Sequence, residues 1–199
     1  MIDFWISIGS TYSYLTVMRL KAVEQETGVT FRWRPFSVRA IMIEQKNIPF
    51  VGKPVKLAYM WRDVERRARA RGLKPRLPAP YPLKEFDLAN RVAIVGEGEG
   101  WCADYVSAVY DHWFHAGREP GLEPGLSEVL REIGQSPARV VELAGTDAVA
   151  ERYRLATEEA KALGVFGSPT FVVDGEVFWG DDRLDDALRW GERKAAARD

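Results

Sequence analysis

The sequence is poor in cysteine, and this scarcity limits its chemistry. Its single thiol, Cys102, can form no intrachain disulfide, no CxxC redox pair and no cysteine-based metal cluster. The formal net charge of −1 over 199 residues gives no strong overall field for nucleic acid. No apolar run approaches the roughly 20 residues of a membrane-spanning helix, and the chain starts without the basic stretch of a signal peptide. We therefore expect a cytoplasmic protein with no nucleic-acid, membrane or metal partner.

The chain does contain a strand-to-helix turn that is rich in hydroxyl groups. Asp3–Ile8 has the bulky, β-favouring residues of a short buried strand, and Gly9 interrupts that pattern. Ser10–Ser13 then leads into a helix with periodic apolar residues. A hydroxyl at such a turn lies beside backbone N–H groups without helical partners, so it can help to hold an anion. Alternatively, Ser10 or Thr11 is only a helix cap.

Strand signals occur near the start of the chain, and helix signals fill the middle. The first helix is expected to end near Gly28, and residues 29–34 alternate as a second strand that Pro35 ends. A strand, a helix and a strand over this length predict a βαβ unit with a parallel pair. From Val38 to about Gly164 the patterns favour helices, including Lys56–Arg71. Aromatic and apolar residues recur there at every fourth position: Trp101, Tyr105, Val109 and Trp113.

The last part of the chain returns to strands. Thr170–Val173 and Glu176–Trp179 flank Asp174-Gly175, a pair that favours a type I′ turn and hence a β-hairpin. Acidic residues from Asp181 onward are typical of the first turn of a helix. The predicted order is therefore βαβ, a helical block, then ββα.

Three segments, in this order along the chain, resemble one known family. They are Ser10–Leu15 (STYSYL), Asn47–Phe50 (NIPF) and Val165–Leu184 (VFGSPTFVVDGEVFWGDDRL). They resemble kappa-class glutathione transferases and, more closely, 2-hydroxychromene-2-carboxylate isomerases, which are relatives of the DsbA-like oxidoreductases. The resemblance implies a thioredoxin-like α/β fold with an all-helical domain inserted after the first βαβ unit. It divides the chain into a discontinuous thioredoxin-like domain, 1–36 plus 165–199, and an inserted helical domain, 37–164.

The same resemblance implies a cofactor. The redox relatives carry CxxC where this chain has Ser10–Ser13, and serine cannot exchange disulfides. A serine hydroxyl can instead donate a hydrogen bond to a thiolate that arrives with glutathione, so Ser10 is the expected catalytic residue. The family usually has proline after this serine. Here Thr11 takes that place and can compete as the donor.

Two further segments are expected to bind glutathione. By the same resemblance, the Ser168–Pro169 peptide is expected to be cis, and the backbone of Ser168 to pair with the cysteinyl unit of glutathione. Alternatively, this dipeptide forms an ordinary trans turn. Trp179 to Asp182 implies a cradle for the γ-glutamyl end, in which Asp182 binds the ammonium and Gly180 and Asp181 supply backbone groups. A plainer interpretation is that Asp181 caps the final helix and Asp182 complements the helix dipole, and both interpretations can hold at once.

The resemblance also implies a substrate and an activity. Residues of the helical block at positions where family members contact substrate or the glycine end of glutathione are Asn47, Lys56, Tyr59 and Tyr81. The implied activity is glutathione-dependent cis/trans isomerisation of an aromatic carboxylate in aromatic hydrocarbon catabolism, by a homodimer. A kappa-like glutathione S-transferase is one alternative. A non-catalytic thioredoxin-fold module that binds a peptide at Ser168-Pro169 is another.

Overall fold

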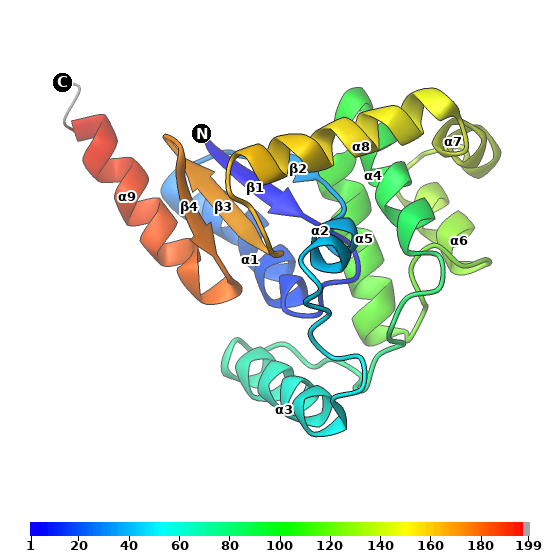
Figure 1. Ribbon diagram of the computed structural model, residues 1–199, viewed down its shortest axis with the longest axis horizontal. Coiled ribbons are helices and arrows are strands. Elements are labelled where there is room, and N and C mark those ends of the chain that lie inside the picture. Colours follow the sequence, from blue (N-terminus) through cyan, green and yellow to red (C-terminus); the bar gives the residue numbers. More distant parts are fainter. Residues whose placement is uncertain (197–199) are drawn as a thin grey trace.

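The computed structural model describes residues 1–196, and the two ends of the chain meet in one mixed four-stranded sheet (Figure 1). The strands, in the spatial order β2-β1-β3-β4, are β1 (Ile2–Ile6), β2 (Phe31–Pro35), β3 (Thr170–Val173) and β4 (Glu176–Trp179). β1 is parallel to β2 and antiparallel to β3, which forms a hairpin with β4. Phe4 of β1 thus lies between Trp33 and Phe171. This order agrees with the predicted βαβ and ββα units.

Helices fill the chain between β2 and β3. The helix α1 (Ser13–Thr27) connects β1 to β2, and α9 (Leu184–Ala196) follows β4 after a short 3₁₀ turn at Asp181–Arg183. The inserted helices are α2 (Val38–Glu44), α3 (Pro54–Ala70), α4 (Phe86–Glu99), α5 (Cys102–His115), α6 (Gly125–Glu132), α7 (Pro137–Ala144) and α8 (Asp147–Ala162). α4 and α8 pack against β2, whereas α3 lies below the sheet in Figure 1 and contacts α5 through the Trp61 and Phe114 rings. Within residues 1–196, no helix is both long and apolar enough to cross a membrane.

The periodic aromatic residues of the middle segment form the centre of the helical block. Trp101, Tyr105, Val109 and Trp113 are all buried along one face of α5, as their spacing predicts. They belong to the same cluster of buried side chains as Phe4 in the sheet. The domain limits 1–36 plus 165–199 and 37–164 stay a prediction, and residues 197–199 of the first domain lie outside the described part.

Two predicted strand limits differ from the structure, for identifiable reasons. β1 ends at Ile6 and not at Ile8, because the Ser7 and Ile8 amides bond to side chains of other segments. The second strand ends at Pro35 as predicted, but it includes this proline, paired with Ile6, and not only the residues before it. β2 is an edge strand, where a missing backbone N–H disturbs no central ladder.

Candidate active site

The turn after β1 faces the peptide that precedes β3. The Ser168–Pro169 bond is cis, as expected. The Ser10 hydroxyl donates to the Ser168 carbonyl at 2.5 Å, and the Ser7 amide donates to the Ser168 hydroxyl at 2.9 Å. The Ser13 hydroxyl lies 3.0 Å from that same Ser168 oxygen. The structure therefore brings the two predicted anchors of the site, Ser10 and Ser168, into direct contact.

Buried polar side chains from the helical block fix the backbone of this turn. Asn90 of α4 accepts from the Ile8 amide at 2.8 Å and donates to the Ile8 carbonyl at 2.9 Å. Tyr110 of α5 donates to the Ser10 carbonyl at 2.9 Å, and burial raises its pKa, so it stays protonated as a donor. Neither residue was predicted, because an Asn or a Tyr within a helical pattern carries no local signal of a distant partner.

Gly9 brings the turn close to α4. Its φ of 121° is accessible to glycine but rarely to other residues. A β-carbon at this position would lie 2.7 Å from the Phe86 ring. A glycine is therefore required directly before Ser10, both for the backbone conformation and for the close approach of α4.

The hydroxyls of Ser10 and Thr11 have different surroundings. Ser10 is partly exposed, whereas Thr11 is 3% exposed and donates to the Met60 sulfur of α3 at 2.8 Å. The N-cap of α1 is Tyr12, and no side chain makes a capping hydrogen bond there. The alternative expectation that Ser10 or Thr11 is only a helix cap is therefore wrong. Both residues precede the positive end of the α1 dipole.

The segment after β4 adjoins the cis-proline. The Gly180 amide donates to the Pro169 carbonyl at 2.9 Å, and Trp179 packs on Phe166 with ring centroids 4.8 Å apart. Asp182 is exposed and pairs with Arg183 at 2.7 Å, and this hydrogen bond lowers the pKa of the Asp182 carboxyl. The carboxylate stays charged at neutral pH, as binding of an ammonium group would require.

The Asp181 side chain makes contacts that the sequence did not predict. It is 1% exposed, and its carboxylate accepts hydrogen bonds from Thr16, Arg67 and Arg71. The cap position before the 3₁₀ turn is Gly180, and no side chain caps it. The expectation that Asp181 caps the final helix is therefore wrong. Its side chain is committed to α1 and α3, which leaves only its backbone for a ligand.

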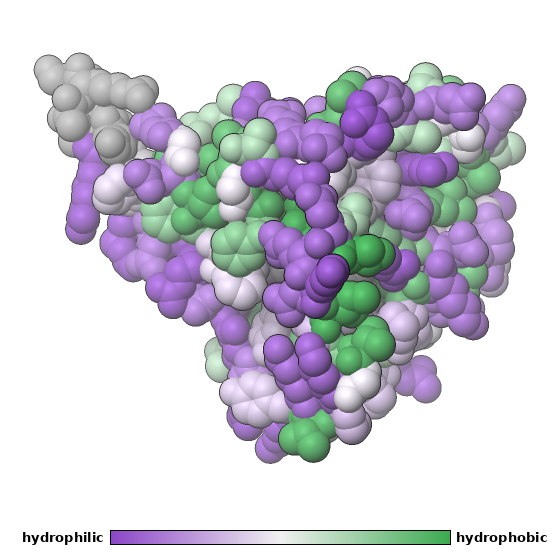
Figure 2. Space-filling view, viewed as in Figure 1, coloured by the Kyte–Doolittle hydropathy of each residue, from purple (hydrophilic) through white to green (hydrophobic). Residues whose placement is uncertain are grey.

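The other predicted residues lie on and around α3. Lys56 and the 60%-exposed Tyr59 line an open groove at the start of this helix. The Lys56 ammonium lies 5.8 Å from the Phe50 ring, which makes an edge contact with the half-buried Tyr81 at 6.1 Å. Asn47 is exposed on the connection between α2 and α3. Figure 2 shows hydrophobic residues at the surface of this face of the molecule. Ile43 of α2, and Ile48 and Val51 on the connection from α2 to α3, are exposed.

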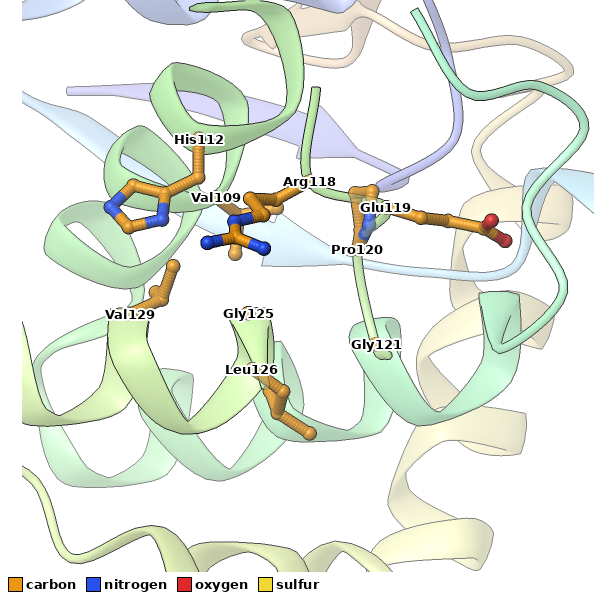
Figure 3. A pocket seen from close by; sticks show the side chains of 9 residues that line it. All are labelled: Val109, His112, Arg118, Glu119, Pro120, Gly121, Gly125, Leu126 and Val129. Atoms are coloured by element: carbon orange, nitrogen blue, oxygen red, sulfur yellow. The ribbon is translucent and has the colours of Figure 1, made fainter. Parts of the chain in front are cut away.

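A second, smaller pocket lies apart from these residues. It is between α5 and α6, with His112, Arg118 and Leu126 among its lining side chains, and it includes none of the predicted site residues (Figure 3). His112 pairs with Glu132, whereas His115 contacts Asp111 at 2.7 Å. The two histidines thus have separate carboxylate partners.

Known proteins match both the sequence and the fold. The family described as DSBA-like thioredoxin domain matches residues 1–189. A relative from Sphingobium xenophagum, named 2-hydroxychromene-2-carboxylate isomerase, is 28% identical over 186 residues, or 92% of this chain and 94% of the relative. A solved structure of a 2-hydroxychromene-2-carboxylate isomerase, at 28% identity, has a TM-score of 0.86 and covers 100% of this chain and 98% of that one.

A further relative matches a shorter part of the chain. Glutathione S-transferase kappa 1 of Caenorhabditis elegans is 36% identical over 69 residues, or 34% of this chain and 30% of that protein. The resemblance inferred from the three motifs is confirmed, and the fold is thioredoxin-like with inserted helices. The chain belongs to the DSBA-like thioredoxin domain family.

Proposed function

We propose that this protein is a glutathione-dependent isomerase of the 2-hydroxychromene-2-carboxylate isomerase type. The observation that carries the proposal is the contact between the Ser10 hydroxyl and the Ser168 carbonyl at the start of α1. This turn can bind a sulfur but cannot supply one, since the chain's single thiol, Cys102, is buried in α5. The similarity to curated isomerases over most of the chain supports the same reaction class.

The donors and acceptors at this turn fit glutathione. The backbone of Ser168 pairs with the cysteinyl unit in the manner of an added strand, and Pro169 keeps that backbone facing the turn. The Ser10 hydroxyl then turns from the Ser168 carbonyl to the thiolate, exchanging one hydrogen bond for another. Thr11 lines the same turn, with its hydroxyl directed to Met60. Ser10 is the catalytic residue. Thr11 contributes to glutathione binding only as part of the turn that surrounds the sulfur.

Separate segments of the chain bind the γ-glutamyl end and the glycine end of glutathione. Asp182 takes the ammonium, and the backbone of Gly180 and Asp181 takes the γ-glutamyl carboxylate beside Trp179. Residues assigned to the glycine end or to the substrate carboxylate and ring are Asn47, Lys56, Tyr59 and Tyr81. Lys56 supplies a positive charge beside the Phe50 and Tyr81 rings, which suits an aromatic carboxylate.

The chemistry requires a group that both attacks and leaves. Bound glutathione would supply a thiolate, which is a good nucleophile and a good leaving group: its addition to the conjugated carbon of the ring-opened substrate turns the double bond into a single bond that can rotate, and breaking the same C–S bond restores the double bond and the glutathione. Ser10 stabilises the negative charge on sulfur with one hydrogen bond. The N-terminus of α1 adds its dipole. The proposed reaction converts 2-hydroxychromene-2-carboxylate to trans-o-hydroxybenzylidenepyruvate.

Turnover with a substoichiometric amount of glutathione tests the proposal. An isomerase converts many equivalents of 2-hydroxychromene-2-carboxylate while total thiol stays constant. A kappa-like transferase, which the shorter match favours as the second candidate, consumes one glutathione per product. Absence of binding heat with glutathione would reject both, and binding of a peptide instead would favour a non-catalytic module. The Cys102→Ala variant is the control, because its full activity shows that the thiol comes from glutathione.

Two further expectations belong with this proposal. A cytoplasmic location suits it, because the glutathione pool there is reducing. The homodimer implied by the family resemblance stays a prediction, and sedimentation of the purified protein tests it.

A further inference from the structure

The most deeply buried charged group beside the proposed site is the Asp181 carboxylate, and it belongs to a cluster that we call the arginine clamp: Thr16, Arg67, Arg71 and Asp181. Arg71 donates to both carboxylate oxygens at 2.9 Å, and Arg67 donates to one of them at 2.5 Å. The Thr16 hydroxyl donates at 3.1 Å. The Asp181 side chain is 0% exposed, whereas the side chains of Arg67 and Arg71 are 27% and 26% exposed.

The arginine clamp joins three segments that carry different parts of the site. Thr16 lies on α1, one turn after Ser13, which contacts Ser168. Asp181 lies between Gly180 and Asp182, the proposed γ-glutamyl residues. Arg67 and Arg71 lie at the end of α3, whose first turns carry Lys56 and Tyr59. The Asp181 carboxylate thus links three parts of the proposed site: α1, which follows the turn at Ser10; the Gly180–Asp182 segment; and the end of α3.

The helix α3 has little else to hold it. Of its residues 54–70, only Met60, Val64 and Ala68 are buried, and in Figure 1 it lies below the sheet. Its ring contacts with the rest of the helical block are those of Trp61 with Tyr81 and with Phe114 of α5, at centroid distances of 6.0 and 6.4 Å. Its polar links to the start of α1 are the bond from Thr11 to Met60 and that from Tyr12 to Asp63 at 3.1 Å.

We infer that Asp181 is a positioning residue, which through Arg67 and Arg71 holds α3 and the Gly180–Asp182 turn in register with α1 and so sets the affinity for glutathione. The inference rests on the proposed function. A carboxylate removed from water is stable only when its lone pairs are filled, and here three donors fill them. With amide in place of carboxylate, the charge that holds two guanidinium groups disappears. Arg67 then has a second acceptor within reach, Asp63 at 3.9 Å, and α3 is released from the 3₁₀ turn.

Asp181→Asn, an isosteric change, tests the inference with two independent readouts. We expect KM for glutathione to rise about tenfold while kcat at saturating glutathione stays within about twofold, since one charge-assisted contact is worth about that ratio. Hydrogen exchange of the α3 amides, measured without any ligand, is expected to accelerate about tenfold because local opening becomes easier. Asp185→Asn and Arg69→Gln are the matched controls. Asp185, in the first turn of α9, pairs with Arg19, and Arg69 of α3 pairs with Glu65. Neither variant should change KM for glutathione or the exchange of the α3 amides.

A merely structural ion cluster gives a different result. Asp181→Asn then melts at a lower temperature than the wild type. At temperatures where the variant is folded, its KM for glutathione and the exchange rates of its α3 amides equal those of the wild type. That result overturns the inference. If Asp181→Asn does not fold, Arg71→Gln leaves Arg67 on the carboxylate and is read by the same two measurements. If the wild type binds no glutathione, the proposed function and the affinity effect fail together. Exchange in α3 then decides separately whether the arginine clamp holds the helix.

Discussion

Replacing Ser10 with alanine is expected to raise the pKa of enzyme-bound glutathione thiol and to slow turnover by about 10². The hydroxyl is part-exposed and lies at the start of α1, with its proton directed at the Ser168 carbonyl, 2.5 Å away. Tyr110 donates a hydrogen bond to the Ser10 carbonyl, and Asn90 accepts one from the Ile8 amide, so both fix the backbone around Ser10. The substitution therefore removes the donor and leaves its backbone in place.

The magnitude follows from the charge of the acceptor. A hydrogen bond to a charged group contributes about 1.5–3 kcal/mol, and one pKa unit corresponds to about 1.36 kcal/mol. Loss of the Ser10 donor should thus raise the thiol pKa by about one to two units, and near neutral pH the thiolate fraction should fall by about 10- to 100-fold. The α1 dipole remains, so activity should fall but not vanish.

Ultraviolet titration of the bound thiolate, together with steady-state turnover, measures both quantities. Thr11→Val is the matched variant, because the Thr11 hydroxyl is buried against the Met60 sulfur. It should shift the thiol pKa by no more than a few tenths of a unit. The reasoning is refuted if Ser10→Ala leaves both the thiol pKa and kcat unchanged. A loss seen only in Thr11→Val would assign the donor role to Thr11.

Three further predictions concern the supports of the site and the charge of the surface. Gly9→Ala should lower the free energy of unfolding by about 1–3 kcal/mol, through its positive φ and its contact with α4. Gly28 also has a positive φ, but a β-carbon there would meet no neighbouring atom, so Gly28→Ala should lower the free energy of unfolding by less in the same urea titration. Asn90→Leu should cost about 2 kcal/mol or more, because it leaves the buried Ile8 amide and carbonyl unpaired, and urea denaturation that equals the wild type would refute this. Hydrogen bonds from Arg139 and Trp101 lower the pKa of Glu99 to about 2, so its stabilisation is present above about pH 4.5 and is lost as pH falls toward 2. Since the Glu99–Arg139 pair is half exposed, the free energy of unfolding of the wild type should fall over that range by at most about 1 kcal/mol more than that of Glu99→Gln. Equal falls in both proteins would contradict a stabilising role for the Glu99 carboxylate.

The parts of the fold that were predicted correctly have local causes. Asp174-Gly175 has positive φ at both residues, 50° and 82°, and these are the conformations that a tight hairpin turn between β3 and β4 needs. The aromatic stripe of α5 is visible in sequence because helix periodicity alone places its members on one face. The contact between Ser10 and Ser168, 158 residues apart, was available only through the family resemblance.

The features that sequence reasoning missed depend on distant partners. Asp181 was assigned to a helix start because an acid after a strand is typical of one, whereas Arg67 and Arg71, more than 100 residues away, bury it. Asn90 has no cap or turn signal, because its partner is the backbone of Ile8. Pro35 was expected to lie just beyond the second strand and not within it, since the edge position of β2 that tolerates a proline follows only from the sheet order.

A crystal of the protein grown with excess glutathione would show directly whether the tripeptide binds at the start of α1. We expect the glutathione sulfur within hydrogen-bonding distance of the Ser10 hydroxyl, with the cysteinyl backbone paired to Ser168. Glutathione bound elsewhere, or a sulfur that contacts neither Ser10 nor the start of α1, would contradict this expectation.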